Sequence, residues 1–285
     1  MSSDSLPDAE TLSVRFWGVR GSIPAAGAKF ERFGGNTPCV EIRCGNRLFV
    51  VDGGSGIMPF GRILAADPPR EIDIVLSHLH LDHVFGIPFF KPALSPQCRI
   101  RLHCGNLRGE SAEEALTRLF SPPLFPISLS QLPGRFEHHG FKAGDDLVFA
   151  DGFRLRTIPL NHPGGATGYR FDFGGRAVCY ISDIEHSDPW PPKDLQDFLR
   201  GADLVIYDGM FSETEYLCCQ GWGHSTWQKG VALAQAAGVP HLAVFHLHPM
   251  HDDAHLDEVE TEIKAAMPGA FLAREGLVLT YRSRS

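Results

Sequence analysis

The stretch Ile72-Asp73-Ile74-Val75-Leu76-Ser77-His78-Leu79-His80-Leu81-Asp82-His83 decides how the chain is expected to fold. Its first half is apolar and β-branched, which predicts a buried β-strand. That strand leads directly into four side chains that can bind metal within six positions: His78, His80, Asp82 and His83. Imidazole and carboxylate ligands suit Zn²⁺, Mn²⁺ or Fe. The stretch therefore predicts a metal site at the end of a strand.

The spacing of these side chains favours two ions. Alternation along an extended turn lets His78 and His80 point the same way, while Asp82 and His83 can face a second ion close by. Two ions about 3.5–4 Å apart can share a hydroxide and hold a phosphate for in-line displacement. A lone histidine after a strand is usually a solvated loop residue, but four such side chains directly after Ile74-Val75-Leu76 argue against that interpretation.

Length and composition indicate a globular protein with a substantial core. The 285 residues fit one large α/β domain or two small ones, with 43% hydrophobic and 21% charged residues. We expect residues 1–12, rich in Ser, Asp, Pro and Glu, to be disordered and residues 13–285 to form a single catalytic domain. The net charge of −8 argues against long nucleic acid as the main partner, because such binding draws on clustered Lys and Arg.

The sequence favours a cytoplasmic protein without membrane contact. Residues 1–12 lack the basic start and apolar run of a signal peptide, and no apolar stretch reaches the roughly 18 residues that span a bilayer. The cysteines are odd in number and contain no CxxC pair, which indicates reduced thiols. The seven are Cys39, Cys44, Cys98, Cys104, Cys179, Cys218 and Cys219.

Short β-like runs separated by turns occur in both halves of the chain, with helical patterns between them. This order predicts an α/β protein in which sheets pack face to face with helices outside. Residues 121–135, rich in Pro, Leu, Phe and Ser, are expected to form an ordered loop. The predicted strands are Val14–Trp17, Cys39–Arg43, Leu48–Val51, Ile72–Ser77, Arg99–Cys104, Leu147–Phe149, Arg154–Pro159, Gly168–Phe173, Ala177–Ser182, Leu204–Tyr207 and Leu242–His246; the predicted helices are Glu113–Phe120, Thr226–Ala237 and Leu256–Met267.

The HxHxDH order at the end of a strand resembles the metallo-β-lactamase superfamily, and the resemblance covers nearly the whole chain from Val14 onward. It implies the four-layer αβ/βα sandwich of that superfamily, whereas periodicity alone indicates only an α/β sandwich. It also implies that His78 and His80 bind one metal ion and that Asp82 and His83 bind the other. The implied cofactors are two divalent ions, Zn²⁺ first, with Mn²⁺ or Fe as alternatives.

The resemblance implies three further ligands, each directly after a strand-like run. His162 would complete the first site, Asp183 matches the carboxylate that bridges the ions, and His246 would complete the second site. His248 stands only two residues beyond His246, so it can be mistaken for that ligand or can reach the substrate.

The segment Gly223-His224-Ser225-Thr226 resembles ribonuclease Z and related phosphodiesterases. Ser225 or Thr226 can cap a following helix, whose free N–H groups favour an anion. The resemblance implies that His224 contacts the scissile phosphate and protonates the leaving oxygen. A helix-start histidine without a chemical role is the alternative.

The block Arg15–Pro24, followed by Gly34-Gly35-Asn36-Thr37, resembles a group of stand-alone bacterial metallo-hydrolases described as phosphodiesterase-like. Asp52, after the run Leu48–Val51, is expected to orient a ligand histidine, and Asp208 is a second candidate for that role. Arg20 has two open interpretations, a phosphate contact and a structural salt bridge.

We expect a dinuclear metal-dependent hydrolase, first of all a phosphodiesterase that cleaves small phosphodiesters such as cyclic nucleotides through a metal-bridging hydroxide. Asp82 would orient or deprotonate the water, and His224 would serve as general acid. Small substrates are preferred because no long basic insertion resembles the arm with which ribonuclease Z grips tRNA. The alternatives are an RNA 3′-processing endonuclease, a thioester or lactone hydrolase on the same metal core, and a metal-binding or ligand-sensing protein. A homodimer is compatible with the sequence.

Overall fold

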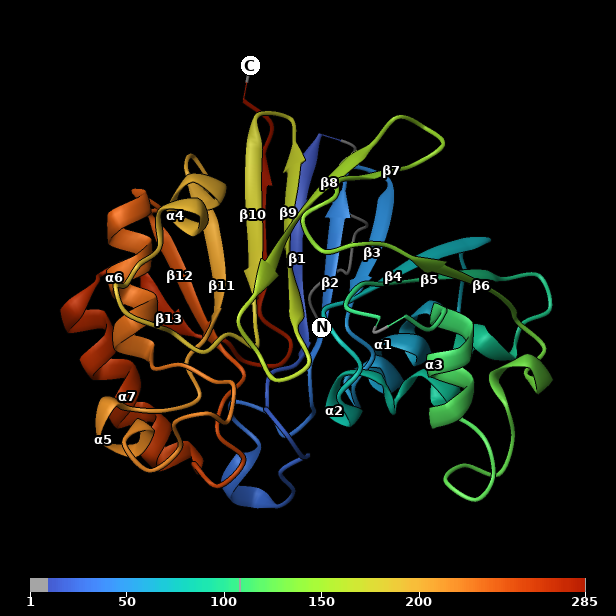
Figure 1. The fold of residues 1–285 in the computed structure, drawn as a ribbon, viewed down its shortest axis with the longest axis horizontal. Helices are drawn as coiled ribbons and strands as arrows, with labels where there is room; N and C mark the ends of the chain where they lie inside the picture. Colours follow the sequence, from blue (N-terminus) through green and yellow to red (C-terminus); the bar gives the residue numbers. More distant parts are fainter. Residues whose placement is uncertain (1–9, 108, 285) are drawn as a thin grey trace.

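Two seven-stranded β-sheets pack against each other, and helices cover their outer faces (Figure 1). The computed structural model describes residues 10–107 and 109–284. Helices α1 (Ile57–Leu64) and α3 (Ala112–Leu119) contact the first sheet, while α6 (Trp227–Ala237) and α7 (Asp253–Ala266) contact the second. The layers therefore follow the order helix, sheet, sheet, helix that was predicted.

Each sheet mixes parallel and antiparallel neighbours. The first has the order β14-β1-β2-β3-β4-β5-β6 and the second β13-β12-β11-β10-β9-β8-β7. The strands of the first are β1 (Thr11–Gly18), β2 (Cys39–Cys44), β3 (Arg47–Val51), β4 (Glu71–Leu76), β5 (Arg99–Cys104), β6 (Arg135–Gly140) and β14 (Val278–Arg282); those of the second are β7 (Leu147–Val148), β8 (Arg154–Leu160), β9 (Ala166–Phe173), β10 (Arg176–Ile181), β11 (Leu204–Asp208), β12 (His241–Phe245) and β13 (Ala270–Leu272).

Strand direction brings the ends of several strands to one edge of the molecule. In the first sheet β3, β4, β5 and β6 run parallel. In the second, β10, β11 and β12 run parallel, and β8 points the same way because β9 is antiparallel to both β8 and β10. Since carboxyl ends of parallel strands share an edge, residues that follow β4, β8, β10 and β12 are brought together.

Three of the four strands that deliver these residues, β4, β10 and β12, are buried except at their first residue, whereas β8 is partly exposed. β4 exposes only its first residue, and all five residues of β11 are buried. Continuous apolar runs of this kind are typical of parallel strands covered on both faces. The inner faces of the sheets meet in a core containing Phe16, Tyr169, Tyr180 and Phe245, with Tyr180 and Phe245 in edge contact at 5.6 Å between ring centroids. This core fixes the two sheets relative to each other.

The remaining helices are short, and their ends follow ordinary capping chemistry. Thr226 caps α6 by accepting from the amide of Lys229, which selects it over Ser225 as the predicted cap. Gly238 ends α6 in the left-handed conformation, which a residue without Cβ adopts readily. The others are α2 (Leu81–Val84), α4 (Lys193–Leu199) and α5 (Glu213–Tyr216), with 3₁₀ turns at η1 (Ala28–Phe30), η2 (Ile87–Phe89), η3 (Lys91–Leu94) and η4 (Leu129–Gln131).

Some predicted boundaries need correction. The expected loop 121–135 contains the turn η4, and its last residue already belongs to β6, a strand whose polar sequence Arg-Phe-Glu-His-His-Gly hides the alternation that predicts strands. The strands β13 and β14 were not predicted either. Disorder was predicted for residues 1–12, of which residues 1–9 lie outside the described part of the chain. Thr11 and Leu12 belong to β1, so the predicted boundary is wrong there. Among residues 10–107 and 109–284, no helix has the length and apolarity needed to cross a membrane.

Candidate metal centre

The metal centre lies at the shared edge where the two sheets present their strand ends. The HxHxDH stretch leaves β4 at Leu76, and α2 begins at Leu81 inside it. This geometry separates the stretch into an extended part, with His78 and His80, and a helical turn, with Asp82 and His83. The structure brings all seven predicted ligands together; the metal binding itself stays a prediction.

The first group consists of His78, His80 and His162, each of which offers one nitrogen within 4.8 Å of the others. His80 Nδ1 and His162 Nε2 face each other at 3.1 Å. The ring centroid of His78 lies 4.3 Å from that of His80 and 4.6 Å from that of His162. Three imidazoles with converging nitrogens match the ligand set of a zinc site.

The second group consists of Asp82, His83 and His246. Oδ2 of Asp82 lies 3.3 Å from Nε2 of His83 and 3.3 Å from Nε2 of His246. The two histidine nitrogens are also 3.3 Å apart. These separations are close to the roughly 3.3 Å between neighbouring ligands of a tetrahedral ion with bonds of about 2.0–2.1 Å.

Asp183 stands between the two groups. Its Oδ1 lies 3.8 Å from Nε2 of His78 and 3.4 Å from Nε2 of His246, and its Oδ2 lies 3.3 Å from Nε2 of His83. Asp183 and His246 both have positive φ, 61° and 58°, directly after buried strands. Such backbone conformations are sparsely populated by residues with a Cβ and are typical of functional sites. The position of Asp183 suits the bridging carboxylate that was predicted.

In the part of the chain that the structure describes, some nitrogen atoms of the predicted ligands lack the hydrogen-bond partners that buried polar atoms normally have. Nε2 of His78 is buried and has no hydrogen-bond partner among the described residues. Burial lowers the pKa of His78, which favours a neutral imidazole that has one nitrogen lone pair available for a metal ion. Two imidazole nitrogens that face each other, as in His83 and His246, leave lone pairs that a cation would satisfy. The residues present therefore fit two divalent ions.

A buried carboxylate underneath orients the second group. Asp52, after β3, accepts from His83 Nδ1 at 2.8 Å and from the hydroxyl of Tyr180 at 2.7 Å. It also accepts from the amide and hydroxyl of Ser77. The bond to Nδ1 directs Nε2 of His83 toward Asp82 and Asp183, as predicted for Asp52.

His224 lies at the margin of the metal centre, and its ring stacks on His246 with centroids 4.8 Å apart. Its Nδ1 donates to Asp208 Oδ2 at 2.9 Å, so Asp208 orients His224 rather than a predicted ligand. Although burial opposes the charged form, the carboxylate of Asp208 raises the pKa of His224 to about 9. His224 is therefore protonated at neutral pH and has Nε2 as a remaining donor.

The structure favours a structural role for Arg20 over a phosphate contact. Its side chain is completely buried and donates to the carbonyls of Gly34, His248 and His251. A guanidinium held in this way does not reach the substrate. The ring of His248 lies 5.7 Å from that of Phe211 and 4.7 Å from that of His251, and His248 belongs to neither group of predicted ligands.

Glu185 was missed by the sequence analysis. It accepts from the amides of Gly221 and Gly223 and from the hydroxyl of Tyr216. The carbonyl of Gly223 in turn accepts from His162 Nδ1 at 2.8 Å. A Cβ at Gly223 would lie 2.4 Å from that nitrogen, so the close approach requires glycine. In the sequence, the position of Glu185 two residues after Asp183 was the signal that could have indicated its role.

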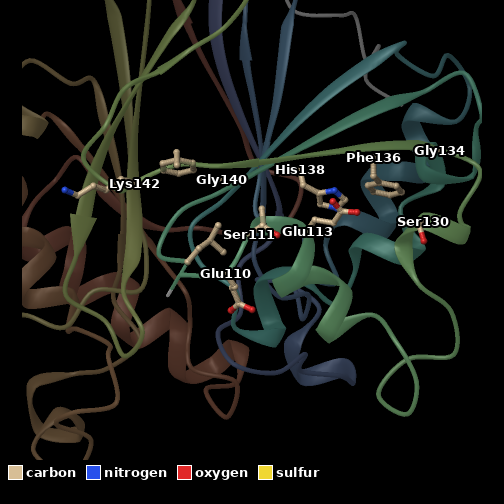
Figure 2. Close-up of a pocket in the computed structure, with 12 residues that line it drawn as sticks. Glu110, Ser111, Glu113, Ser130, Gly134, Phe136, His138, Gly140 and Lys142 are labelled. Carbon is tan, nitrogen blue, oxygen red and sulfur yellow. The ribbon is translucent and has the colours of Figure 1, made fainter.

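Two adjoining cavities lead away from the first group of ligands. The smaller, about 160 Å³, is lined by His78, His80, Asn106 and Arg118 among others. The larger, about 760 Å³, lies between α3 and β6 and includes Glu113 and His138 (Figure 2). Leu107 and Glu110 line both cavities, and Arg118 pairs with Glu110.

Comparison with known proteins gives the family. The profile described as "Beta-lactamase superfamily domain" matches residues 47–247, which is more than half of the chain. The chain belongs to this superfamily. The resemblance inferred from HxHxDH and the predicted four-layer fold are thereby confirmed, and the chain is a metal-dependent hydrolase.

Members of the superfamily resemble the chain over almost its full length. A protein named Ribonuclease Z from Bradyrhizobium sp. (strain ORS 278) is 25% identical, with 91% of this chain and 96% of that protein covered. The metallo-beta-lactamase fold protein YhfI from Bacillus subtilis is 20% identical, with a TM-score of 0.71 and coverage of 95% and 100%. The short form of human tRNase Z is 18% identical, with a TM-score of 0.62 and coverage of 94% and 98%. The two structures support the fold.

Proposed function

We propose that this superfamily member is a dinuclear phosphodiesterase that hydrolyses small phosphodiesters, cyclic nucleotides among them. The observation that carries the proposal is the position of His224, which a hydrogen bond to Asp208 holds beside the group of Asp82, His83 and His246. Hydrolysis of a phosphodiester requires both charge neutralisation at phosphorus and a proton for the leaving oxygen.

The chain's own residues divide these tasks. His78, His80 and His162 would hold one ion, Asp82, His83 and His246 the other, and Asp183 both. When bound, the ions would lower the pKa of a water molecule and neutralise charge on the phosphate. Asp82 would orient that water or take its proton. As the water oxygen forms its bond to phosphorus and the ester bond breaks, His224 would give its proton to the leaving oxygen.

Charge and cavity shape favour a small substrate. The chain carries a net charge of −8. Arg118 lines the smaller cavity beside the ligands, but its charge is paired with Glu110. Glu113 adds a further acidic side chain to the larger cavity. Lys142 also lines the larger cavity, so the case against a long polyanion rests on the net negative charge of the chain. A small diester needs contact only with the metal centre and His224.

The experiment is hydrolysis of bis(p-nitrophenyl) phosphate and of 2′,3′- and 3′,5′-cyclic nucleotides by metal-loaded protein. We expect turnover of all these esters to be lost in His80→Ala, which removes a predicted ligand. In His224→Ala, which keeps all seven, turnover of the cyclic nucleotides should be strongly reduced and that of bis(p-nitrophenyl) phosphate much less. His139→Ala, on the exposed part of β6, is the matched control. A protein with two metals per chain and no turnover of these esters would refute the proposal and direct the search to thioesters and lactones.

Processing of RNA 3′ ends is the second candidate, because sequences named Ribonuclease Z are similar over 91% of this chain. It is tested by cleavage of precursor tRNA with a 3′ trailer at increasing salt. An RNA enzyme that relies on phosphate contacts loses affinity steeply, by about 10³-fold or more between 50 and 200 mM salt. Turnover of a cyclic nucleotide should change far less over the same range.

A further inference from the structure

A further cluster of side chains that could bind a metal ion lies apart from the seven predicted ligands. Glu215, His251 and His255 each offer one ligand atom, and these atoms all lie within 4.8 Å of one another. Glu215 belongs to α5, His251 precedes α7, and His255 lies in the first turn of α7. The sequence analysis left His251 and His255 without a role.

The side chains of this group already face one another. His251 Nε2 lies 2.6 Å from Oε1 of Glu215, and the ring centroids of His251 and His255 are 4.2 Å apart. A hydrogen bond explains the contact between His251 and Glu215 but gives no reason for the second imidazole beside it. A cation shared by all three side chains accounts for both contacts.

Contacts from neighbouring residues hold each ligand in place. Oε2 of Glu215 accepts from the amide and hydroxyl of Ser212, which leaves Oε1 to face His251. The carbonyl of His251 accepts from the buried Arg20 at 2.7 Å. Asp252 caps α7 by accepting from the amide of His255. Ligands that are fixed before binding lose little conformational entropy when the ion arrives.

The protonation states also suit a cation. Burial lowers the pKa of His251, so its imidazole is neutral at neutral pH. Although partial burial opposes ionisation, hydrogen bonds from Ser212 lower the pKa of Glu215, which keeps it a carboxylate. Two imidazoles and one carboxylate, with water in the fourth position, form a ligand set that Zn²⁺ accepts.

We propose that Glu215, His251 and His255 form a third divalent-metal site, of the zinc class, separate from the dinuclear centre. A bound ion would join α5 to the start of α7. Tyr216 of α5 donates to Glu185, which holds the amides of Gly221 and Gly223. The third ion would therefore stabilise the segment that carries His224, without contact with the substrate.

Metal content per chain tests this site independently of activity. Protein dialysed against limiting free Zn²⁺ is analysed by mass spectrometry of the metal, for the wild type, His251→Ala, His255→Ala and the control His139→Ala. We expect the first two variants to hold one metal ion fewer per chain than the wild type and the control. The same metal content in all four proteins would overturn the proposal and leave an ordinary hydrogen bond between His251 and Glu215.

Thermal unfolding gives a second readout on folded protein. His255 is exposed, so His255→Ala should fold normally. Saturating the third site should raise the wild-type Tm by about 5 °C more than that of His255→Ala, because an ion bound only to the native state stabilises it. Equal Zn²⁺-dependent shifts in both proteins would also contradict a third site. Because neither readout uses a substrate, the outcome does not depend on the proposed phosphodiesterase activity.

Discussion

One cluster of acidic and histidine side chains centres on Asp73 within β4, and the metal centre follows the end of β4. The two differ in the partners of their carboxylates. The Asp73 cluster consists of Asp73, Arg47, Arg101 and His103. Asp73 Oδ1 accepts from Arg101 at 2.7 Å and His103 at 2.9 Å, and Oδ2 accepts from Arg47 and Arg101 at 3.0 Å. In the metal centre, which begins at His78, imidazole nitrogens face one another, and Nε2 of His78 has no hydrogen-bond partner within residues 10–107 and 109–284.

The difference shows what a buried His–Asp pair can mean. The Asp73 cluster contains its own cations, so its carboxylate is complete without a ligand. The metal centre places carboxylates and lone pairs around a common space, an arrangement that an added cation would satisfy. Residue type alone does not separate the two cases, whereas the hydrogen bonds do. The predictions below test this distinction.

The largest effect is expected at Asp183. Asp183→Ala removes the carboxylate between both ligand groups, so we expect bound metal to fall and phosphodiester turnover to drop by about 10³-fold or more. Metal analysis and kcat/KM on bis(p-nitrophenyl) phosphate measure both quantities. Asp73→Asn is the matched control, and it should retain full metal content. Loss of metal in the control as well would contradict the distinction between the clusters.

His224→Ala is expected to reduce kcat by about 10²-fold on substrates with a poor leaving group, since general acid catalysis contributes about 10²–10⁴. Metal content should stay unchanged, because His224 is not a predicted ligand. Esters of p-nitrophenol, whose leaving oxygen needs no proton, should lose much less. A uniform loss across good and poor leaving groups would show that His224 acts by some means other than proton donation.

Removing the carboxylate of the Asp73 cluster should affect stability rather than chemistry. Asp73→Ala leaves Arg47 and Arg101 without their partner, and we expect a loss of about 3 kcal/mol in the free energy of unfolding. Urea unfolding of the metal-loaded protein measures it. Specific activity at 25 °C should remain within about twofold of the wild type. A large loss of activity with unchanged stability would place Asp73 in the catalytic machinery instead.

Asp52→Asn should weaken metal binding less than the loss of a predicted ligand such as Asp183 and more than a change in the Asp73 cluster. Asp52 accepts from His83 Nδ1 and orients this predicted ligand without being one. Loss of such a partner typically weakens metal affinity or activity by about 10–100-fold. A competition titration with a metal chelator measures the affinity, with Asp73→Asn as the control that should bind like the wild type. Wild-type affinity in Asp52→Asn would show that packing alone orients His83.

The sequence predicted which side chains the structure brings together as candidate metal ligands, and the reason is geometric. Parallel strands place their carboxyl ends at one edge, so a polar residue after β4, β8, β10 or β12 is brought to the same place. The ligands His162, Asp183 and His246 follow this rule. The role of Asp52 could be predicted for the same reason, since it follows β3.

The roles of Arg20 and Glu185 and the strand β6 could not be predicted, because they depend on contacts between residues that are distant in the sequence. Arg20 donates to the carbonyls of His248 and His251, more than 220 positions away in the sequence. Glu185 acts through loop amides whose approach depends on backbone conformation at Gly221 and Gly223. The strand β6 was missed because an edge strand with a polar sequence gains its structure from the neighbouring β5.

The smallest expected effect is the acid dependence of the Asp73 cluster. Although burial opposes ionisation, His103 and Arg101 lower the pKa of Asp73 below its usual value. A depressed carboxyl pKa gives stability that is present above the unfolded value near pH 4 and is lost as pH falls toward the folded value. Between pH 5 and pH 3 the protonation of Asp73 alone should lower the free energy of unfolding by about 1 kcal/mol.

Comparing wild type with Asp73→Asn isolates that contribution. Asparagine does not titrate, so the variant should be less stable at pH 7 but should lose about 1 kcal/mol less than the wild type between pH 5 and pH 3. Both proteins are unfolded in urea after the metal has been removed, because protonation of the metal ligands would otherwise add its own pH dependence. Parallel curves for the two proteins would mean that Asp73 keeps an ordinary pKa. The Asp73 cluster would then be hydrated rather than closed, and hydrogen-bond completeness would no longer distinguish it from the metal centre.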